Sequence, residues 1–482
     1  MPDMKRLLVI YDDRQRPGDE IKEITGLKHF GGIIFKRRSL RDIFDRDTGM
    51  SLEKAGMTGE IKHLTGAVSV LPETGKRTAV VRVFSDCIIR NIPEFSVILK
   101  KAGYTEDDYR VMAGDRVAAI IYRDSGSFFR DEDICEDTDA IRERALDYDE
   151  ISSDAFYDIS VKEHFLSFIT GGFEARFFNS VSGDRYTVTK KSNNIEKIRA
   201  EYRFYYLLPE SMRSWFVLPY DFREEGGQAS YKMQRYHMTD LAIRYVHGAI
   251  SPEEFEKILD TLFFFINNRE EEEVSWNEFY ERRKSLYIDK VEMRISELKN
   301  HPDFPKLEAY IREGTASKGI NEILKRYEDI YDRMIGNKKD RLVKTVSHGD
   351  LCFSNILYSP DNNLMRFIDP KGATEAEGIY SDPLYDIAKL SHSVNGRYDF
   401  MNSGLYDIQV GEDMKLTLDI DGDIKEYRAL FAKKIGEAGM DLKTVRLFEC
   451  SLFLSMLPLH MDRPQKVLAF ILNAVNIMDE ID

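Results

Sequence analysis

The fold is read from two linked segments, Val346-Ser-His-Gly-Asp-Leu-Cys-Phe-Ser-Asn-Ile-Leu-Tyr358 and Phe367-Ile-Asp-Pro-Lys-Gly372. Residues 355–358 and 364–368 are short apolar runs, and the residues between them, Ser359-Pro-Asp-Asn-Asn363, are rich in turn formers. This pattern predicts a hairpin that brings Asn355 and Asp369 near each other although they are fourteen positions apart. Both side chains offer the oxygen ligands that Mg²⁺ takes while it keeps some of its waters.

A third polar residue, Asp350, lies on the loop that precedes this hairpin, five residues before Asn355. An aspartate, an asparagine and a second aspartate in this order are typical of phosphoryl transfer from ATP. One carboxylate receives the proton of the acceptor hydroxyl, and the other two groups hold Mg²⁺ against the nucleotide. We therefore predict that Asp350 is catalytic and that Asn355 and Asp369 bind the metal. His348 is expected to orient the loop through hydrogen bonds.

Composition limits the other possibilities. A chain of 482 residues with 43% hydrophobic and 32% charged residues is expected to be globular and to form two or three domains. Its net charge of −15 argues against non-specific binding of nucleic acid. The four cysteines form no C-x-x-C pair, which fits a reducing compartment. The apolar run at residues 7–11 is too short for a signal-peptide core, and no apolar stretch reaches spanning length. We expect a cytoplasmic protein without membrane insertion.

Three regions follow from the distribution of apolar residues. Residues 1–150 are predicted to form an α/β domain, with strands at 7–11, 32–35, 79–84 and 117–122. Residues 160–246 are β-rich apart from a helix at 195–208, and residues 247–482 are mostly helical. A helix is expected to begin after Ser251, because Ser-Pro-Glu-Glu supplies a cap, a proline at the first position and acids in the first turn.

The segments HGDLCFSNIL and FIDPKG resemble the catalytic and metal-binding loops of the aminoglycoside phosphotransferase and choline kinase-like family. The resemblance covers residues from about 160 to 482. It implies a bilobal α+β protein-kinase-like fold, with a β-rich small lobe before a helical large lobe, and phosphorylation of a small-molecule hydroxyl by ATP. The segment Tyr380–Leu390 resembles the helix that follows the metal loop in this family. Asp386 is expected to bond backbone near the catalytic loop, and Asp382 to cap that helix.

The same resemblance implies a small-lobe lysine that holds the ATP phosphates and pairs with a glutamate on a helix. Lys190 ends the expected strand at 186–190, and Glu201 lies eleven residues later in the helix. Lys191 is an alternative to Lys190, because neighbouring residues of a strand point to opposite faces.

Two further segments are implied to contact the nucleotide. Gly171 and Gly172 precede the lysine strand, where backbone N–H groups would approach phosphate, but the full G-x-G-x-x-G pattern is missing and a plain turn fits equally well. Backbone groups near Gln234 and Tyr236 are expected to bond adenine, with Met233 beside them. An ordinary strand is the competing interpretation.

The amino-acid composition does not determine the chemical class of the acceptor substrate. Choline-type substrates require aromatic cages and aminoglycosides require acidic pockets, and the composition does not choose between them. Residues 1–150 are faintly similar to a nucleotidyltransferase domain of surface-polysaccharide pathways that has lost its glycine-rich, basic loop. By analogy this suggests a step in capsule biosynthesis. The alternative function is that of a catalytically inactive, nucleotide-binding scaffold. A protein kinase is disfavoured, because no arginine stands beside Asp350 and no Ala-Pro-Glu segment follows Asp369.

Overall fold

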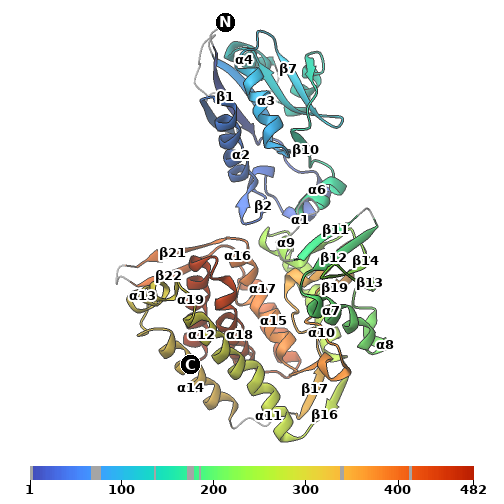
Figure 1. Ribbon diagram of the computed structural model, residues 1–482, viewed down its shortest axis with the longest axis vertical. Coiled ribbons are helices and arrows are strands. Elements are labelled where there is room, and N and C mark those ends of the chain that lie inside the picture. Colours follow the sequence, from blue (N-terminus) through green and yellow to red (C-terminus); the bar gives the residue numbers. More distant parts are fainter. Residues whose placement is uncertain are drawn as a thin grey trace. The chain divides into compact units, whose positions relative to one another are not determined.

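The computed structural model describes residues 4–66, 78–134, 137–170, 179–183, 186–336, 341–411 and 415–482. The chain divides into two compact units (Figure 1), Met1–Phe173 with His247–Ala249 and Glu174–Val246 with Ile250–Asp482. The first unit therefore continues past residue 150. One reason is that strand β10 (Phe156–Asp158) pairs with β6 (Cys87–Ile89), far back along the chain. No helix among the described residues combines the length and the apolar character needed to cross a membrane.

The first unit is built on a mixed six-stranded sheet in the order β4-β1-β5-β8-β7-β9. Alternate strand residues face two separate cores. Val9 packs toward the side of α2 and α3, and Ile10 packs toward the side of α4 and α5. The sheet strands are β1 (Arg6–Asp12), β4 (Gly59–Leu64), β5 (Thr78–Phe84), β7 (Tyr109–Ala113), β8 (Arg116–Tyr122) and β9 (Asp149–Ile151). The other elements are α1 (Asp19–Thr25), β2 (Ile34–Phe35), β3 (Arg38–Ser39), α2 (Leu40–Ala55), α3 (Ile92–Ala102), α4 (Ser125–Ile134), α5 (Thr138–Ala145) and α6 (Lys162–Ile169).

Buried ion pairs account for the acids at the ends of β1 and β5. Asp12 accepts hydrogen bonds from Arg82 Nε at 2.8 Å and from Arg14 Nε at 3.0 Å. Asp86 accepts from Arg116 Nε at 2.7 Å and from Arg142 Nη1 at 3.0 Å. Buried carboxylates require such partners. In the described part of the chain, no group of three or more His, Cys, Asp or Glu residues is arranged to hold a metal ion. The ion pairs favour a structural interpretation of these acids.

The second unit begins with an antiparallel sheet in the order β11-β12-β14-β13, against which helix α7 packs through Ile198 and Tyr231 (Figure 1). Asn194 caps α7 by accepting a hydrogen bond from the Lys197 N–H. These elements are β11 (Asn179–Gly183), β12 (Thr187–Ser192), α7 (Ile195–Leu207), α8 (Glu210–Arg213), β13 (Pro219–Glu225) and β14 (Gln228–Gln234).

Two three-stranded sheets connect this region to the helices. One has the order β15-β18-β19 and contains the hairpin expected from the sequence, and the other has the order β16-β17-β20. Both of them flank the loop at residues 347–355. Their strands are β15 (Thr239–Asp240), β16 (Glu271–Glu273), β17 (Val343–Val346), β18 (Ile356–Ser359), β19 (Leu364–Phe367) and β20 (Tyr380–Ser381), and a separate hairpin consists of β21 (Tyr406–Val410) and β22 (Leu416–Ile420).

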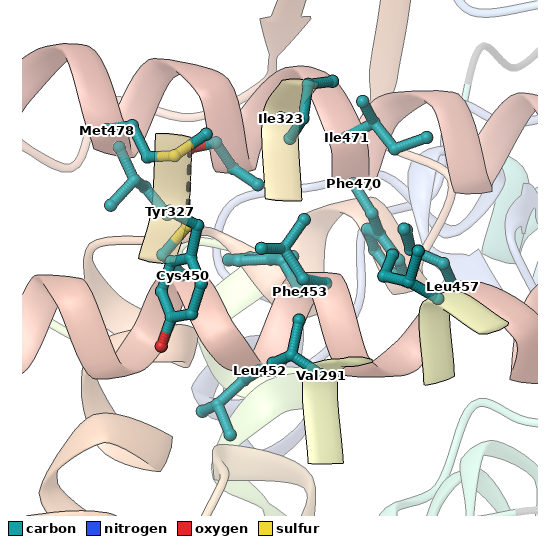
Figure 2. Packing of buried hydrophobic residues seen from close by; sticks show 14 of the residues in the cluster. Val291, Ile323, Tyr327, Cys450, Leu452, Phe453, Leu457, Phe470, Ile471 and Met478 are labelled. Carbon is teal, nitrogen blue, oxygen red and sulfur yellow. Dashed lines mark hydrogen bonds between the residues drawn. The ribbon is translucent and has the colours of Figure 1, made fainter. Parts of the chain in front are cut away.

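Most of the remaining chain is helical, and its largest core lies between α18 and α19. Figure 2 shows Phe453 and Phe470 at the centre of this core, beside Val291 and Ile323 from two other helices. The helices of this part are α9 (Leu241–Val246), α10 (Pro252–Asn267), α11 (Trp276–Lys284), α12 (Lys290–Lys299), α13 (Phe304–Gly314), α14 (Ile320–Ile335), α15 (Tyr385–Val394), α16 (Tyr398–Asn402), α17 (Lys425–Glu437), α18 (Leu442–Met456) and α19 (Pro464–Ile481). A β-rich part followed by a helical part fits a kinase-like fold.

Some local expectations are met and others are wrong. Ser251 caps α10 by accepting a hydrogen bond from the Glu254 N–H, as the sequence indicated. The strand expected at 32–35 is reduced to the two residues of β2, because Phe30–Gly32 forms a 3₁₀ turn. Asp382 does not cap α15. Its carboxylate accepts a hydrogen bond from the Leu384 N–H and forms an ion pair with Arg283 instead. The helix begins only at Tyr385.

Candidate active site

The two sequence motifs form one bonded pair of loops. The Asn355 amide nitrogen donates to the Asp350 carbonyl at 2.8 Å and to the Asp350 carboxylate at 3.1 Å. The Ile368 N–H donates to the Asn355 carbonyl at 3.0 Å, which places the start of the second motif beside the end of the first. Asp350, Asn355 and Asp369 are thereby brought into one region. Since its nitrogen is occupied by Asp350, the amide oxygen of Asn355 is left for another ligand.

The side chains of His348 and Asp386 fix the catalytic loop through hydrogen bonds to backbone groups. The Asp350 N–H donates to His348 Nδ1 at 3.1 Å, so the proton of the imidazole lies on Nε2, which donates to the Ile368 carbonyl at 2.9 Å. Burial lowers the pKa of His348, in agreement with a neutral ring. The carboxylate of Asp386 accepts the N–H groups of His348 and Gly349, each at 2.9 Å. Both residues therefore orient backbone, as the sequence suggested.

Lys190 connects the small sheet to the second motif. Its ammonium lies 2.6 Å from Glu201 Oε2 on α7 and 2.8 Å from Asp369 Oδ1. The Lys190 and Glu201 side chains are only 4% and 3% exposed, whereas Asp369 is 44% exposed. Burial alone would lower the pKa of Lys190, but Asp369 and Glu201 raise it above its ordinary value. Lys191, the alternative, is exposed and points to the other face of β12.

Glycine allows α7 to approach this motif closely. Gly372 has a φ of +87°, and a Cβ at this position would lie 2.9 Å from the backbone nitrogen of Glu201. Beside it, the Ala373 N–H donates to the Ala200 carbonyl at 3.0 Å. The turn after Asp369 is therefore bonded directly to the helix that carries Glu201.

A lysine that the sequence interpretation did not identify contacts Asp350. Lys389, on α15, places its ammonium 2.8 Å from Asp350 Oδ1. Burial would raise the pKa of Asp350, but Lys389 and the Asn355 amide hold it below its ordinary value. Lys389 is 13% exposed and Asp350 is 43% exposed, so the lysine supports the carboxylate from the protein side. The only sequence signal was a position one helical turn after Asp386, on the same face of the helix.

The expected adenine segment follows β14. Met233 pairs with Val188 of β12, Gln234 is exposed at the end of β14, and Tyr236 is half-buried. The guanidinium of Arg366 lies 5.8 Å from the centre of the Tyr236 ring. The chain passes here from the small sheet to β15. The glycine segment with Gly171 and Gly172 lies outside the described residues.

The oxygen donors fit magnesium better than a softer metal. Asn355 supplies an amide oxygen and Asp369 a half-exposed carboxylate, with no thiolate or imidazole between them. Two protein oxygens suit Mg²⁺, which takes its other ligands from water and phosphate. The same two residues would not form a complete metal site without a nucleotide.

Comparison with known proteins gave structural neighbours alone. No family model and no curated protein sequence matches the chain. The chain is similar to the apo form of a thermostable mutant of aminoglycoside phosphotransferase APH(4)-Ia, with 10% identity and a TM-score of 0.36 over 66% of this chain and 99% of that one. It is similar to a ternary complex of this enzyme with AMP-PNP and hygromycin B, with 10% identity and a TM-score of 0.40 over 64% and 92%. A putative fructosamine-3-kinase from Haemophilus somnus has 9% identity and a TM-score of 0.35 over 64% and 89%. At TM-scores below 0.5, function has to be inferred from the residues of the site itself.

Proposed function

We propose that the chain is an ATP- and Mg²⁺-dependent phosphotransferase that acts on a hydroxyl of a small molecule. The observation that carries this proposal is Lys190, which lies within 2.8 Å of both Glu201 and Asp369. Phosphoryl transfer of this kind requires a fixed cation next to a metal-binding carboxylate. Asp350, joined to the metal-binding amide of Asn355, supplies the group that faces the acceptor.

Each residue of the site has its own role in the proposed phosphoryl transfer. Asp350 takes the proton of the acceptor hydroxyl while the hydroxyl oxygen bonds to the γ-phosphorus and the bond to the β–γ bridging oxygen breaks, which releases ADP. Lys190 holds phosphate oxygens, and Glu201 fixes the position of the lysine. Asn355 and Asp369 would hold Mg²⁺, which supplies charge neutralisation on the triphosphate when bound. Positioning and electrostatic stabilisation account for most of the rate enhancement in such sites.

The proposed adenine site is argued from the position of a segment in the fold, whereas the proposed acceptor is argued by analogy. We propose that adenine lies against the segment from Met233 to Tyr236, because that segment connects the small sheet to the helical part. The acceptor is a sugar, polyol or amino alcohol, and a role in surface-polysaccharide biosynthesis remains a prediction by analogy. Buried free thiols at Cys87, Cys352 and Cys450 agree with a reducing cytoplasm.

A phosphate-transfer screen with ATP and Mg²⁺ tests the proposal. The wild type is compared with Asp350→Ala and Asp369→Ala over sugars, polyols, amino alcohols and aminoglycosides. Asp361→Ala is the matched control, since Asp361 is an exposed aspartate of the same hairpin. We expect transfer by the wild type and the control, and a loss of at least about 100-fold in both site variants. Equal, negligible turnover in all four proteins with retained ATP binding would support the scaffold alternative.

A further inference from the structure

The first unit has a hollow beside helix α3, on the side of the sheet that α2 and α3 cover. Its volume is about 520 Å³, which is within the range of pockets that bind small molecules. Helix α3 packs against β5, whereas β7 and β9 lie further toward the edge of the sheet. The helix therefore leaves apolar side chains of these edge strands partly uncovered.

Strand pairing places the floor of the hollow on one face of the sheet. Tyr109 of β7 lies opposite Ile121 of β8, and Val111 of β7 lies opposite Ile151 of β9. Residues two apart along a strand share a face, so these four side chains belong to the core on the side of α3. Ile121 is fully buried, whereas Tyr109 and Ile151 are only partly buried. The apolar core of the first unit is thus accessible at this point.

The opposite wall comes from the end of α3 and the turn that follows it. Val97 and Tyr104, which line the hollow, are 48% and 45% exposed. Lys100 and Lys101 also line it from the last turn of α3, and neither forms an ion pair within the described part of the chain. None of the described residues that line the hollow is acidic. An apolar floor with a cationic rim is complementary to an organic anion.

We propose that this hollow is a binding site for a small organic anion with a flat apolar body. The body packs against Tyr104 and Tyr109, whose ring faces suit a flat group. The negative group lies at the exposed rim, beside Lys100 and Lys101, where it stays in contact with water. The site gives the first unit a binding role of its own, which does not depend on phosphoryl transfer by the second unit.

The test uses 2-naphthoate as the probe and its uncharged amide, 2-naphthamide, as a probe of the same shape. Binding to the full chain is followed by NMR of isotope-labelled isoleucine methyl groups, because Ile121 and Ile151 line the hollow. The variants Ile121→Val and Ile151→Val assign the two signals. We expect both signals to shift with 2-naphthoate until the site is saturated. The amide should bind at least about 5-fold more weakly, since one exposed ion pair contributes up to about that factor.

Substitutions test the rim and the wall separately. The double variant Lys100→Gln with Lys101→Gln should bind 2-naphthoate about 5-fold more weakly and the amide as the wild type does. Lys54→Gln is the matched control and should change neither affinity, because Lys54 is an exposed lysine in the last turn of α2 and does not line the hollow. Val97→Trp fills the hollow from its exposed side and should abolish the shifts with both probes.

The contrary results are equally defined. No shift of the Ile121 and Ile151 signals, shifts confined to other isoleucines, or unchanged shifts in Val97→Trp would overturn the site. Equal affinity for the two probes, or an unchanged affinity for 2-naphthoate in the lysine double variant, would overturn its preference for an anion. Each readout is a binding measurement without turnover, so the outcome is independent of whether the second unit transfers phosphate.

Discussion

Replacement of Lys190 by methionine should destabilise the second unit by an amount that depends on pH. The variant leaves Glu201, which is 3% exposed, with the Tyr231 hydroxyl at 3.2 Å and Lys197 at 3.9 Å as its polar contacts. A buried carboxylate without its cation is costly, so it takes up a proton instead. Burial already raises the pKa of Glu201 above its ordinary value of 4.5 in spite of the Lys190 ammonium, and removal of the ammonium should raise this pKa further.

The sign of the pH dependence follows from linkage. Glu201 in the variant has a folded-state pKa above its unfolded value, so its contribution to stability is complete below about pH 4.5 and is lost as the pH rises. We expect a loss of about 3 kcal/mol at pH 7, as is typical when one partner of a buried ion pair is removed, and a smaller loss at pH 5. The double variant Lys190→Met with Glu201→Gln should recover most of the loss at pH 7, because neither side chain then carries a charge.

Urea unfolding followed by tryptophan fluorescence reports the stability of the second unit, which contains Lys190. The chain has two tryptophans, Trp215 and Trp276, and both lie in the second unit. Lys191→Met is the control and should change stability by less than about 0.5 kcal/mol, since Lys191 is exposed. Equal losses in Lys190→Met and Lys191→Met, or a loss that does not diminish at pH 5, would refute the reasoning.

Two further substitutions test the packing and charge of the same unit by the same fluorescence assay. Gly372→Ala should cost about 2 kcal/mol or more, because the residue has positive φ and its Cβ would lie 2.9 Å from backbone atoms of Ala200 and Glu201. Gly226→Ala, at positive φ but with open space around it, should cost only about 1 kcal/mol. Burial raises the pKa of Asp399 to about 7, so this carboxyl lowers stability as the pH rises from its ordinary pKa of 3.8 toward 7. Asp399→Asn should therefore be more stable than the wild type at pH 8, by up to about 4 kcal/mol, and no more stable at pH 4; equal stability at both pH values would contradict the burial of a charged Asp399.

The sequence predicted the parts of the site that depend on nearby residues. Asn355 and Asp369 flank a hairpin whose turn residues are visible in the sequence, and the observed pairing of β18 with β19 follows from that pattern. The role of Asp386 was implied by the resemblance of the segment Tyr380–Leu390 to the helix that follows the metal loop in the aminoglycoside phosphotransferase and choline kinase-like family. The hairpin depends on residues that are close together along the chain, whereas the partners of Asp386, His348 and Gly349, lie 38 and 37 residues earlier, so its role came from the resemblance.

Contacts between distant segments were harder to predict. Lys191 stayed open as an alternative to Lys190 because the choice depends on which face of β12 meets α7, and that follows from the register with β14. The extent of the first unit was misjudged because β10 pairs with a strand about seventy residues earlier. Lys389 was not identified because its partner depends on how α15 docks against the catalytic loop. Helical periodicity places a residue on a face but does not say what that face contacts.

The two lysines resolve a conflict between the net charge of the chain and its proposed substrate. A protein of net charge −15 repels a triphosphate, and two aspartates at the site add to the repulsion. Lys190 and Lys389 lie within 2.8 Å of Asp369 and Asp350 respectively, and both lysines are far less exposed than the aspartates they contact. The positive charges are thus supplied from inside the protein, while the carboxylates keep about two-fifths of their surface open. Charge neutralisation from the buried side leaves the aspartate oxygens accessible to a metal ion and a hydroxyl, which surface lysines in front of them would block.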